Sequence, residues 1–139
     1  MNKETIRVLL VKPDEKAVMI EMEDSLDAMQ ETVGGMIEEY MPFEDEVAVV
    51  CNEEGKMTNL PPNRAIFDEK GEMQDIIAGP FFVCYAPIES EKFLSLTPEL
   101  EAKYKEKFQF PEQFFRTPEG IKAMKFIPAA DEKNAEQTR

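Results

Sequence analysis

Short apolar runs separated by turn signals dominate the first two thirds of the chain, and they predict strands. Residues 5–11 are rich in aliphatic and β-branched side chains, and residues 17–22 follow after a polar turn, so the two runs predict a hairpin. Residues 46–52 and 81–86 are almost continuously apolar, which is typical of strands that are buried on both faces. A shorter run at residues 36–41 predicts one further strand, closed by a proline.

Helical periodicity first occurs between residues 25 and 33, where apolar side chains recur at intervals of three and four. Asp24 or Ser25 can cap the start of this helix, and Gly34 favours the left-handed backbone conformation that ends it. Residues 63–67 fit either a short helical turn or an edge strand.

Two Thr-Pro-Glu triplets, at residues 97–99 and 117–119, mark the later part of the chain. Each predicts the start of a helix, because proline is accepted in the first helical turn. Large apolar residues follow the first triplet at intervals of four, and the second triplet precedes an apolar stretch at residues 121–126.

These elements together predict an α+β fold with a small mixed or antiparallel sheet. Residues 1–88 form the expected core domain, in which the helix at residues 25–33 covers one face of the sheet. Residues 89–127 form a short helical, aromatic-rich appendage, whose apolar side chains must pack on the same chain or on another chain. Residues 128–139 lack large apolar side chains and are expected to form a disordered tail.

The composition narrows the function classes. The chain has 139 residues and a formal net charge of -13, so direct, general nucleic-acid binding, which needs clustered Lys and Arg, is not expected. It contains no histidine, which removes the commonest general base and a major zinc ligand. The acidic and glycine residues lack the spacing of calcium and phosphate loops, so we expect no catalytic residue, no metal and no cofactor.

The apolar segments also bear on the compartment. None reaches the roughly 20 residues that a membrane span requires, and the N-terminal run is too short for a signal peptide. We therefore expect a cytoplasmic protein without a membrane partner. In that compartment Cys51 and Cys84, each inside an apolar run, are expected to be reduced, buried thiols rather than a disulfide.

Three blocks in the middle of the chain carry a resemblance to a known family. They read QETVGGMIEEY, then VAVVCNEEGKMTNLPPNRAIFDEKG, then DIIAGPFFV, and with the N-terminal TIRVLLVKP they cover roughly residues 5–85. In order and spacing they resemble the bacterial family called domain of unknown function 3846. The resemblance implies a bacterial setting, often on plasmids, phages and integrative elements, and it implies no activity. The segment after Pro87 lies outside it.

Charge segregation is the sharpest feature of the sequence. No basic residue occurs between Lys16 and Lys56, whereas the same stretch holds twelve carboxylates. Such a one-sided field can steer a basic partner, and the alternative is a solvated face that aids solubility. The hypothesis of a partner face rests on ten of these residues: Glu21, Glu23, Asp24, Asp27, Glu31, Glu38, Glu39, Glu44, Asp45 and Glu46.

A second candidate site is a small polar pocket around Arg64. This arginine follows a stiff Pro-Pro pair, and a guanidinium fork binds carboxylate or phosphate in bidentate fashion. The predicted pocket, for a small anionic or nucleotide-like molecule, is lined by Asn52, Asn63, Arg64 and Asp75. The alternative is structural: Arg64 forms a salt bridge with Asp75 or a glutamate and pins the loop, while the two asparagines serve turns.

Two functions are therefore open. The first is a non-enzymatic protein-interaction module, of mobile-element or phage type, that engages a basic protein surface through the acidic stretch and can form homo-oligomers through the aromatic appendage. The second is a small-molecule or nucleotide-like ligand-binding module built around Arg64. An enzyme is the least expected class, because without histidine mainly carboxylate or metal-assisted chemistry is left.

Overall fold

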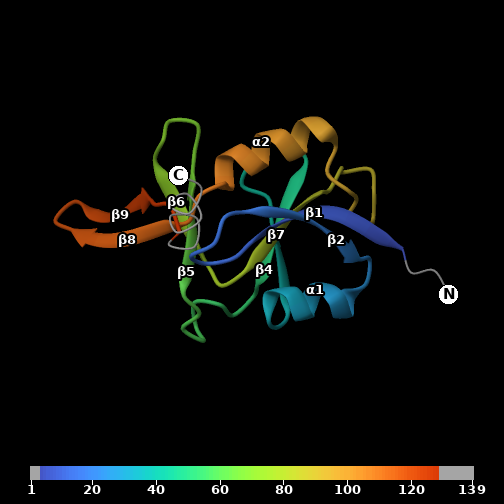
Figure 1. Ribbon diagram of the computed structural model, residues 1–139, viewed down its shortest axis with the longest axis horizontal. Helices are drawn as coiled ribbons and strands as arrows, with labels where there is room; N and C mark the ends of the chain where they lie inside the picture. The colour runs from blue at the N-terminus through green and yellow to red at the C-terminus, as the bar shows by residue number, and fades with distance from the viewer. Residues whose placement is uncertain (1–3, 129–139) are drawn as a thin grey trace, which may run out of the picture.

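A five-stranded antiparallel sheet with the strand order β2-β1-β7-β4-β3 organises the computed structural model, which describes residues 4–128 (Figure 1). The predicted α+β class is confirmed. The central strand β7 and its neighbour β4 are buried on both faces, as their apolar runs predict. The strands of the sheet are β1 (Thr5–Val11), β2 (Val18–Glu23), β3 (Ile37–Tyr40), β4 (Val47–Asn52) and β7 (Phe81–Tyr85).

Helix α1 (Leu26–Val33) packs on one face of this sheet, below it in Figure 1. The Ser25 hydroxyl caps its start by accepting a hydrogen bond of 3.1 Å from a first-turn N–H, and Gly34 ends it with a φ of 81°. Met29 and Val33 are its buried residues, and they join an apolar cluster with side chains of β1, β4 and β7.

A second helix, α2 (Pro98–Phe108), packs on the opposite face, so the sheet has two covering helices where one was predicted, and this part of the predicted appendage packs on its own chain. Its residues Tyr104 and Phe108 are buried among side chains of β1, β4 and β7. Arg7 of β1 fixes the helix from outside through two hydrogen bonds, of 2.8 and 3.0 Å, to the Glu101 carboxylate. Strands that are apolar on both faces require a layer on each side, and α2 supplies the second layer.

Two hairpins complete the described chain. Residues 63–67 belong to a strand, so the second of the two alternatives for this segment holds. The second Thr-Pro-Glu triplet forms the turn of a hairpin and not the start of a helix, because Gly120 takes a φ of 115° and reverses the chain. The hairpin strands are β5 (Pro62–Phe67) with β6 (Met73–Ala78), and β8 (Glu112–Thr117) with β9 (Gly120–Lys125).

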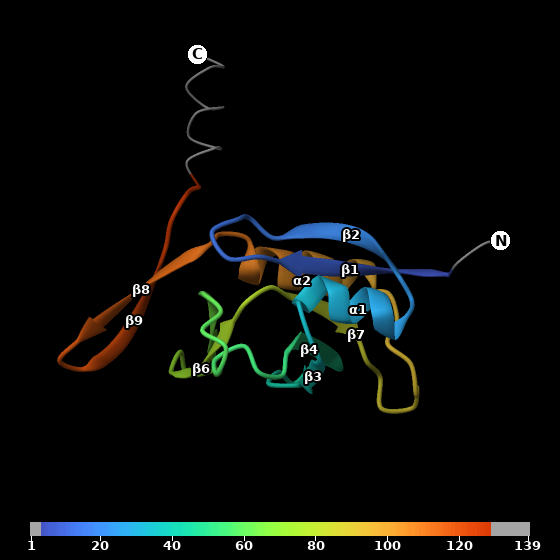
Figure 2. The ribbon, with the colours of Figure 1, turned by 90° about the horizontal axis from the view of Figure 1, so that it is seen from below.

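The hairpin β8–β9, here called the arm, extends away from the sheet and the helices (Figure 2). Its base contacts β5, and several large apolar residues of the arm remain exposed: Phe115, Ile121 and Met124. The predicted helical appendage, residues 89–127, is therefore helical only in α2. Residues 129–139 of the predicted tail lie outside the described residues. Across residues 4–128, no helix is long and apolar enough to cross a bilayer.

Candidate functional site

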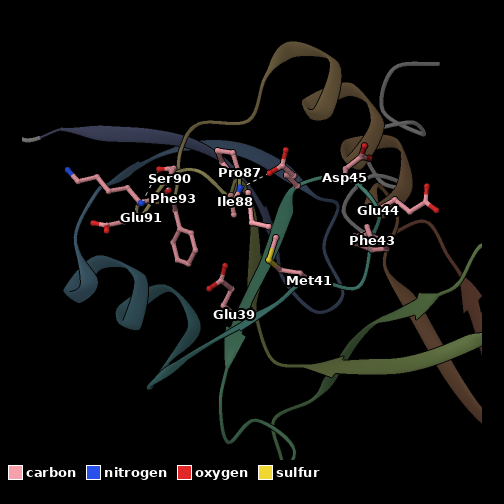
Figure 3. A pocket seen from close by; sticks show the side chains of 13 residues that line it. Glu39, Met41, Phe43, Glu44, Asp45, Pro87, Ile88, Ser90, Glu91 and Phe93 are labelled. Atoms are coloured by element: carbon pink, nitrogen blue, oxygen red, sulfur yellow. Dashed lines mark hydrogen bonds between the residues drawn. The ribbon is translucent and has the colours of Figure 1, made fainter.

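A hollow of about 450 Å³ lies beside the end of β3, the loop that enters β4 and the loop that follows β7 (Figure 3). Pro42 comes shortly after β3 and Pro87 shortly after β7, and proline disfavours continuation of a strand ladder. Both segments therefore leave the sheet at this end and border the hollow. We call it the acidic groove. It is lined by residues 39, 41, 43–46, 86–88 and 90–93.

Backbone hydrogen bonds hold the loop after β7 in a defined shape. Tyr85 and Leu94 exchange two N–H to C=O bonds, of 2.9 and 2.7 Å, so the intervening residues leave the sheet and return to it. Within the loop, Ser90 Oγ accepts from the Lys92 N–H at 3.0 Å and donates to the Lys92 carbonyl at 2.9 Å. The Glu46 carboxylate accepts from the Ile88 N–H at 2.5 Å and so ties this loop to the start of β4.

Carboxylates dominate the lining of the groove. Five acidic residues line it against the single base Lys92, namely Glu39, Glu44, Asp45, Glu46 and Glu91. Asp45 is neutralised by Lys103 of α2, at 2.5 Å, whereas no ion pair within residues 4–128 engages Glu39 or Glu91. The groove therefore carries negative charge that the described chain does not balance.

Glu44, in the loop before β4, also shows the effect of repulsion between carboxylates. The Glu44 carboxyl group raises the pKa of Glu69 through a side-chain hydrogen bond and through charge repulsion. Repulsion of this kind is relieved when a cation or a basic side chain approaches.

Apolar side chains are exposed within the same groove. Ile88 is 92% exposed at the loop after β7, and Met41 is 46% exposed at the end of β3. Figure 3 shows Phe93 and Glu39 converging on the hollow from this loop and from β3. Exposed aliphatic and thioether groups among carboxylates suit a ligand that is both basic and partly apolar.

The ten acidic residues predicted as one partner face are distributed over several surfaces. Glu39, Glu44, Asp45 and Glu46 line the groove, whereas Glu38 lines a second hollow of about 300 Å³. Neighbouring strand residues point to opposite faces of a sheet, which separates Glu38 from Glu39. The remaining residues lie on β2, on α1 and in the turn between them: Glu21, Glu23, Asp24, Asp27 and Glu31.

The polar pocket predicted around Arg64 does not form, because Arg64 and Asn63 are 0% exposed inside the fold. The Arg64 guanidinium donates to the Phe108 carbonyl, at 3.0 and 3.2 Å, and to the Glu15 carbonyl at 2.7 Å. Asn63 donates to the carbonyls of Val11 and Gly79, both at 2.9 Å. Arg64 thus joins β5 to the β1–β2 turn and to the end of α2, a structural role without the predicted salt bridge to Asp75.

Asn52 and Asp75 instead line the second hollow together. Asn52 donates to the Val33 carbonyl at 3.1 Å and accepts from the Glu54 N–H at 2.8 Å, so its side chain stabilises the turn after β4. Asp75 forms an ion pair with Lys56. The four predicted residues therefore divide into a buried pair and a pair that serves a different hollow.

A buried carboxylate that the sequence analysis did not single out lies next to Arg64. Glu112, at the base of the arm, is 7% exposed and accepts from the Ala65 N–H at 2.9 Å. Burial raises the pKa of Glu112 and lowers the pKa of Arg64 to about 10, and the attraction between the two groups opposes both shifts. Both cysteines are buried and free, as predicted.

Comparison with known proteins identifies the family. The profile described as Domain of unknown function (DUF3846) matches residues 6–109. The chain belongs to the DUF3846 family. No curated protein and no solved structure matches it. The DUF3846 match extends beyond the predicted limit near residue 85 and includes α2, which agrees with the position of α2 on the sheet.

The groove lies entirely within the DUF3846 match, and the arm lies beyond it. Sequence reasoning found four of its carboxylates but missed Ile88, Glu91 and Phe93, because it assigned the chain after residue 88 to an appendage. One signal was present: Ile88 and Phe93 are apolar residues in an otherwise polar segment that follows a proline.

Proposed function

We propose that this DUF3846 protein is a non-enzymatic interaction module whose acidic groove docks a basic, partly apolar segment of another protein. The observation that carries the proposal is the combination, in one hollow, of the exposed side chain of Ile88 with carboxylates such as Glu39 and Glu91, which no ion pair among residues 4–128 engages. The proposal assigns no catalytic residue. It assumes that the protein is encoded by a bacterial phage or mobile element, as the family resemblance implies, and that it acts in the cytoplasm.

The two kinds of lining contribute differently to binding. Complementary charge accelerates the encounter and excludes acidic segments, whereas apolar contacts at the centre of an interface supply much of the affinity. The loop after β7 is held by its own hydrogen bonds, so Ile88 is presented without the entropy cost of ordering a flexible segment on binding.

A peptide titration with charge reversal tests this proposal. The probe is a fluorescent peptide that alternates lysine and valine, compared with a peptide in which glutamate replaces lysine. We expect saturable binding of the lysine peptide, weakened about tenfold or more by Glu39→Lys with Glu91→Lys, and weakened further as salt is raised.

The matched control reverses the same number of charges elsewhere, through Glu31→Lys with Glu54→Lys, both at exposed positions. This control has the same net charge as the groove variant. Equal loss of binding in both variants would show that net charge, and not the groove, determines binding. Absence of binding to either peptide would contradict the proposal.

The arm supports a second candidate, self-association of the protein. The strand register places Phe115 and Met124 on the same face of the β8–β9 hairpin, and both are exposed. A two-stranded hairpin alone is marginally stable in water, and burial of such a face in a second copy stabilises it. Light scattering after size exclusion tests this: we expect a dimer or larger species that Phe115→Ser with Met124→Ser converts to monomer.

A further inference from the structure

We propose that the segment bound in the acidic groove adds to the open edge of β3 as a sixth strand of the sheet. The inference rests on the proposed docking function and defines the conformation and sequence pattern of the partner. The bound segment is extended, pairs through its backbone with β3, and carries basic side chains at alternate positions.

The position of β3 in the sheet provides the edge. Within residues 4–128, β3 (Ile37–Tyr40) pairs with β4 and ends the strand order. Figure 2 shows β3 at the margin of the molecule, on the side of the sheet opposite to β2. A terminal strand presents a row of unpaired N–H and C=O groups to an incoming chain.

The hydrogen-bond pattern identifies which residues of β3 face outward. The Glu53 N–H donates to the Met36 carbonyl at 2.8 Å, and these residues lie one step beyond the ladder pair of Ile37 with Asn52. In an antiparallel ladder, residues that bond across the pair alternate with residues that do not. Glu38 and Tyr40 therefore turn their backbone groups toward β4, and Ile37 and Glu39 turn theirs toward the open edge.

Glu39 belongs both to the open edge of β3 and to the lining of the acidic groove. Glu39 presents its N–H and C=O to the edge, while its carboxylate lines the groove on one face of the sheet. Met41, two residues farther, lines the groove as well. A strand paired with β3 therefore places every second side chain beside Glu39 and Met41, where lysine or arginine meets a carboxylate and an exposed thioether.

The acidic edge also explains selectivity. Charged residues on edge strands normally prevent pairing with other chains, and β3 carries Glu38 and Glu39. Acidic strands are repelled by these two carboxylates, and neutral strands leave them uncompensated. A basic segment is the occupant whose charge removes this barrier.

N-methylated peptides test strand addition directly. In the alternating lysine–valine peptide, methyl groups are placed on every second backbone nitrogen, in one frame or in the other. One frame removes the peptide N–H groups that face β3, and the other removes only the peptide N–H groups that point away from β3. We expect one frame to lose binding by about tenfold or more and the other to retain it, with new amide-exchange protection at Ile37 and Glu39.

Two variants of the protein separate charge from backbone pairing. Glu39→Gln removes the carboxylate and keeps the outward N–H, whereas Glu39→Pro removes both, and proline is tolerated on the solvent side of an edge strand. We expect the proline variant to bind about tenfold more weakly than the glutamine variant at equal thermal stability.

The outcomes distinguish the two proposals. Equal binding of both methylated frames, with binding still lost in Glu39→Lys with Glu91→Lys, would overturn strand addition and leave groove docking intact. Absence of peptide binding would overturn both. Protection of Ile37 and Glu39 in the protein alone, together with dimer formation, would assign the edge to a second copy of this chain and overturn the proposed partner.

Discussion

The Tyr104 hydroxyl of α2 donates a hydrogen bond of 2.8 Å to the Asp45 carboxylate, in the loop that lines the acidic groove. Lys103 lies 2.5 Å from the same carboxylate oxygen, and its hydrogen bond holds the pKa of Asp45 below the usual range. Burial, followed by this bond to Asp45, raises the pKa of Tyr104. The helix on one face of the sheet is thereby fixed to a loop of the candidate binding site.

Tyr104→Phe should lower the free energy of unfolding by about 1 kcal/mol, because the ring stays buried while the bond to Asp45 is lost. The measurement is urea unfolding of the wild-type protein, Tyr104→Phe, Asp45→Asn and the double variant, analysed as a double-mutant cycle. A favourable coupling between the two positions is expected. Additive effects of the two substitutions would show that the bond contributes nothing to stability.

The pH dependence of Asp45 gives an independent check. Its pKa is lowered in the folded protein, so its contribution is present above the pKa of the unfolded chain and is lost as the pH falls through the folded value. Asp45→Asn should therefore be least damaging at low pH, relative to the wild-type protein at the same pH.

Arg64→Met should lower the free energy of unfolding by about 3 kcal/mol or more, since it leaves the Phe108 and Glu15 carbonyls without their donor. Arg64→Lys keeps a charge but lacks the planar fork, so it should also destabilise, to a smaller extent. Thermal and urea unfolding measure both effects. Native stability in Arg64→Lys, combined with lost binding of a small anion, would instead support the ligand-binding hypothesis.

The local elements were largely predictable from the sequence. The apolar runs of β4 and β7, the Ser25 cap and the Gly34 stop depend on residues close in the chain, and all are observed. The roles of α2 and of residues 121–126 were not predictable in the same way. A Thr-Pro-Glu triplet begins a helix or a turn equally well, and here Gly120, directly after the second triplet, favours the hairpin.

In the candidate site too, residues that cluster in the sequence were predictable and residues that the fold brings together were not. Its carboxylates were found because they cluster in the sequence, whereas Ile88 and Phe93 join them only through the bridge between Tyr85 and Leu94. Arg64 was misplaced because a stiff preceding Pro-Pro pair indicates a fixed direction but not whether that direction is outward. Burial is a property of the assembled layers, and local sequence does not encode it alone.

The thiols of Cys51 and Cys84 should react slowly in the folded protein. Burial raises the pKa of Cys51 to about 11 and that of Cys84 to about 12, so little thiolate is present at neutral pH. Alkylation by iodoacetamide, followed by peptide mass mapping, should be slow in buffer and fast in urea, with Cys84 the slower of the two. Rapid modification of the folded protein would show that β4 or β7 opens readily.

Glu112→Gln should raise the free energy of unfolding at neutral pH. The pKa of Glu112 is higher in the folded than in the unfolded chain, so the folded state binds its proton more tightly, and wild-type stability falls as the pH rises through this window. The amide oxygen still accepts from the Ala65 N–H, while the cost of burying a charge is removed.

The gain in Glu112→Gln should therefore be largest above the folded pKa and should shrink toward acid pH, where wild-type Glu112 is already neutral. Unfolding in urea at several pH values measures it, with Glu119→Gln at the exposed hairpin turn as the control. Glu112→Ala should destabilise at every pH, because it leaves the Ala65 N–H unpaired. A loss of stability in Glu112→Gln at neutral pH would mean that the attraction between Glu112 and buried Arg64 outweighs desolvation, and that the arm is anchored by charge.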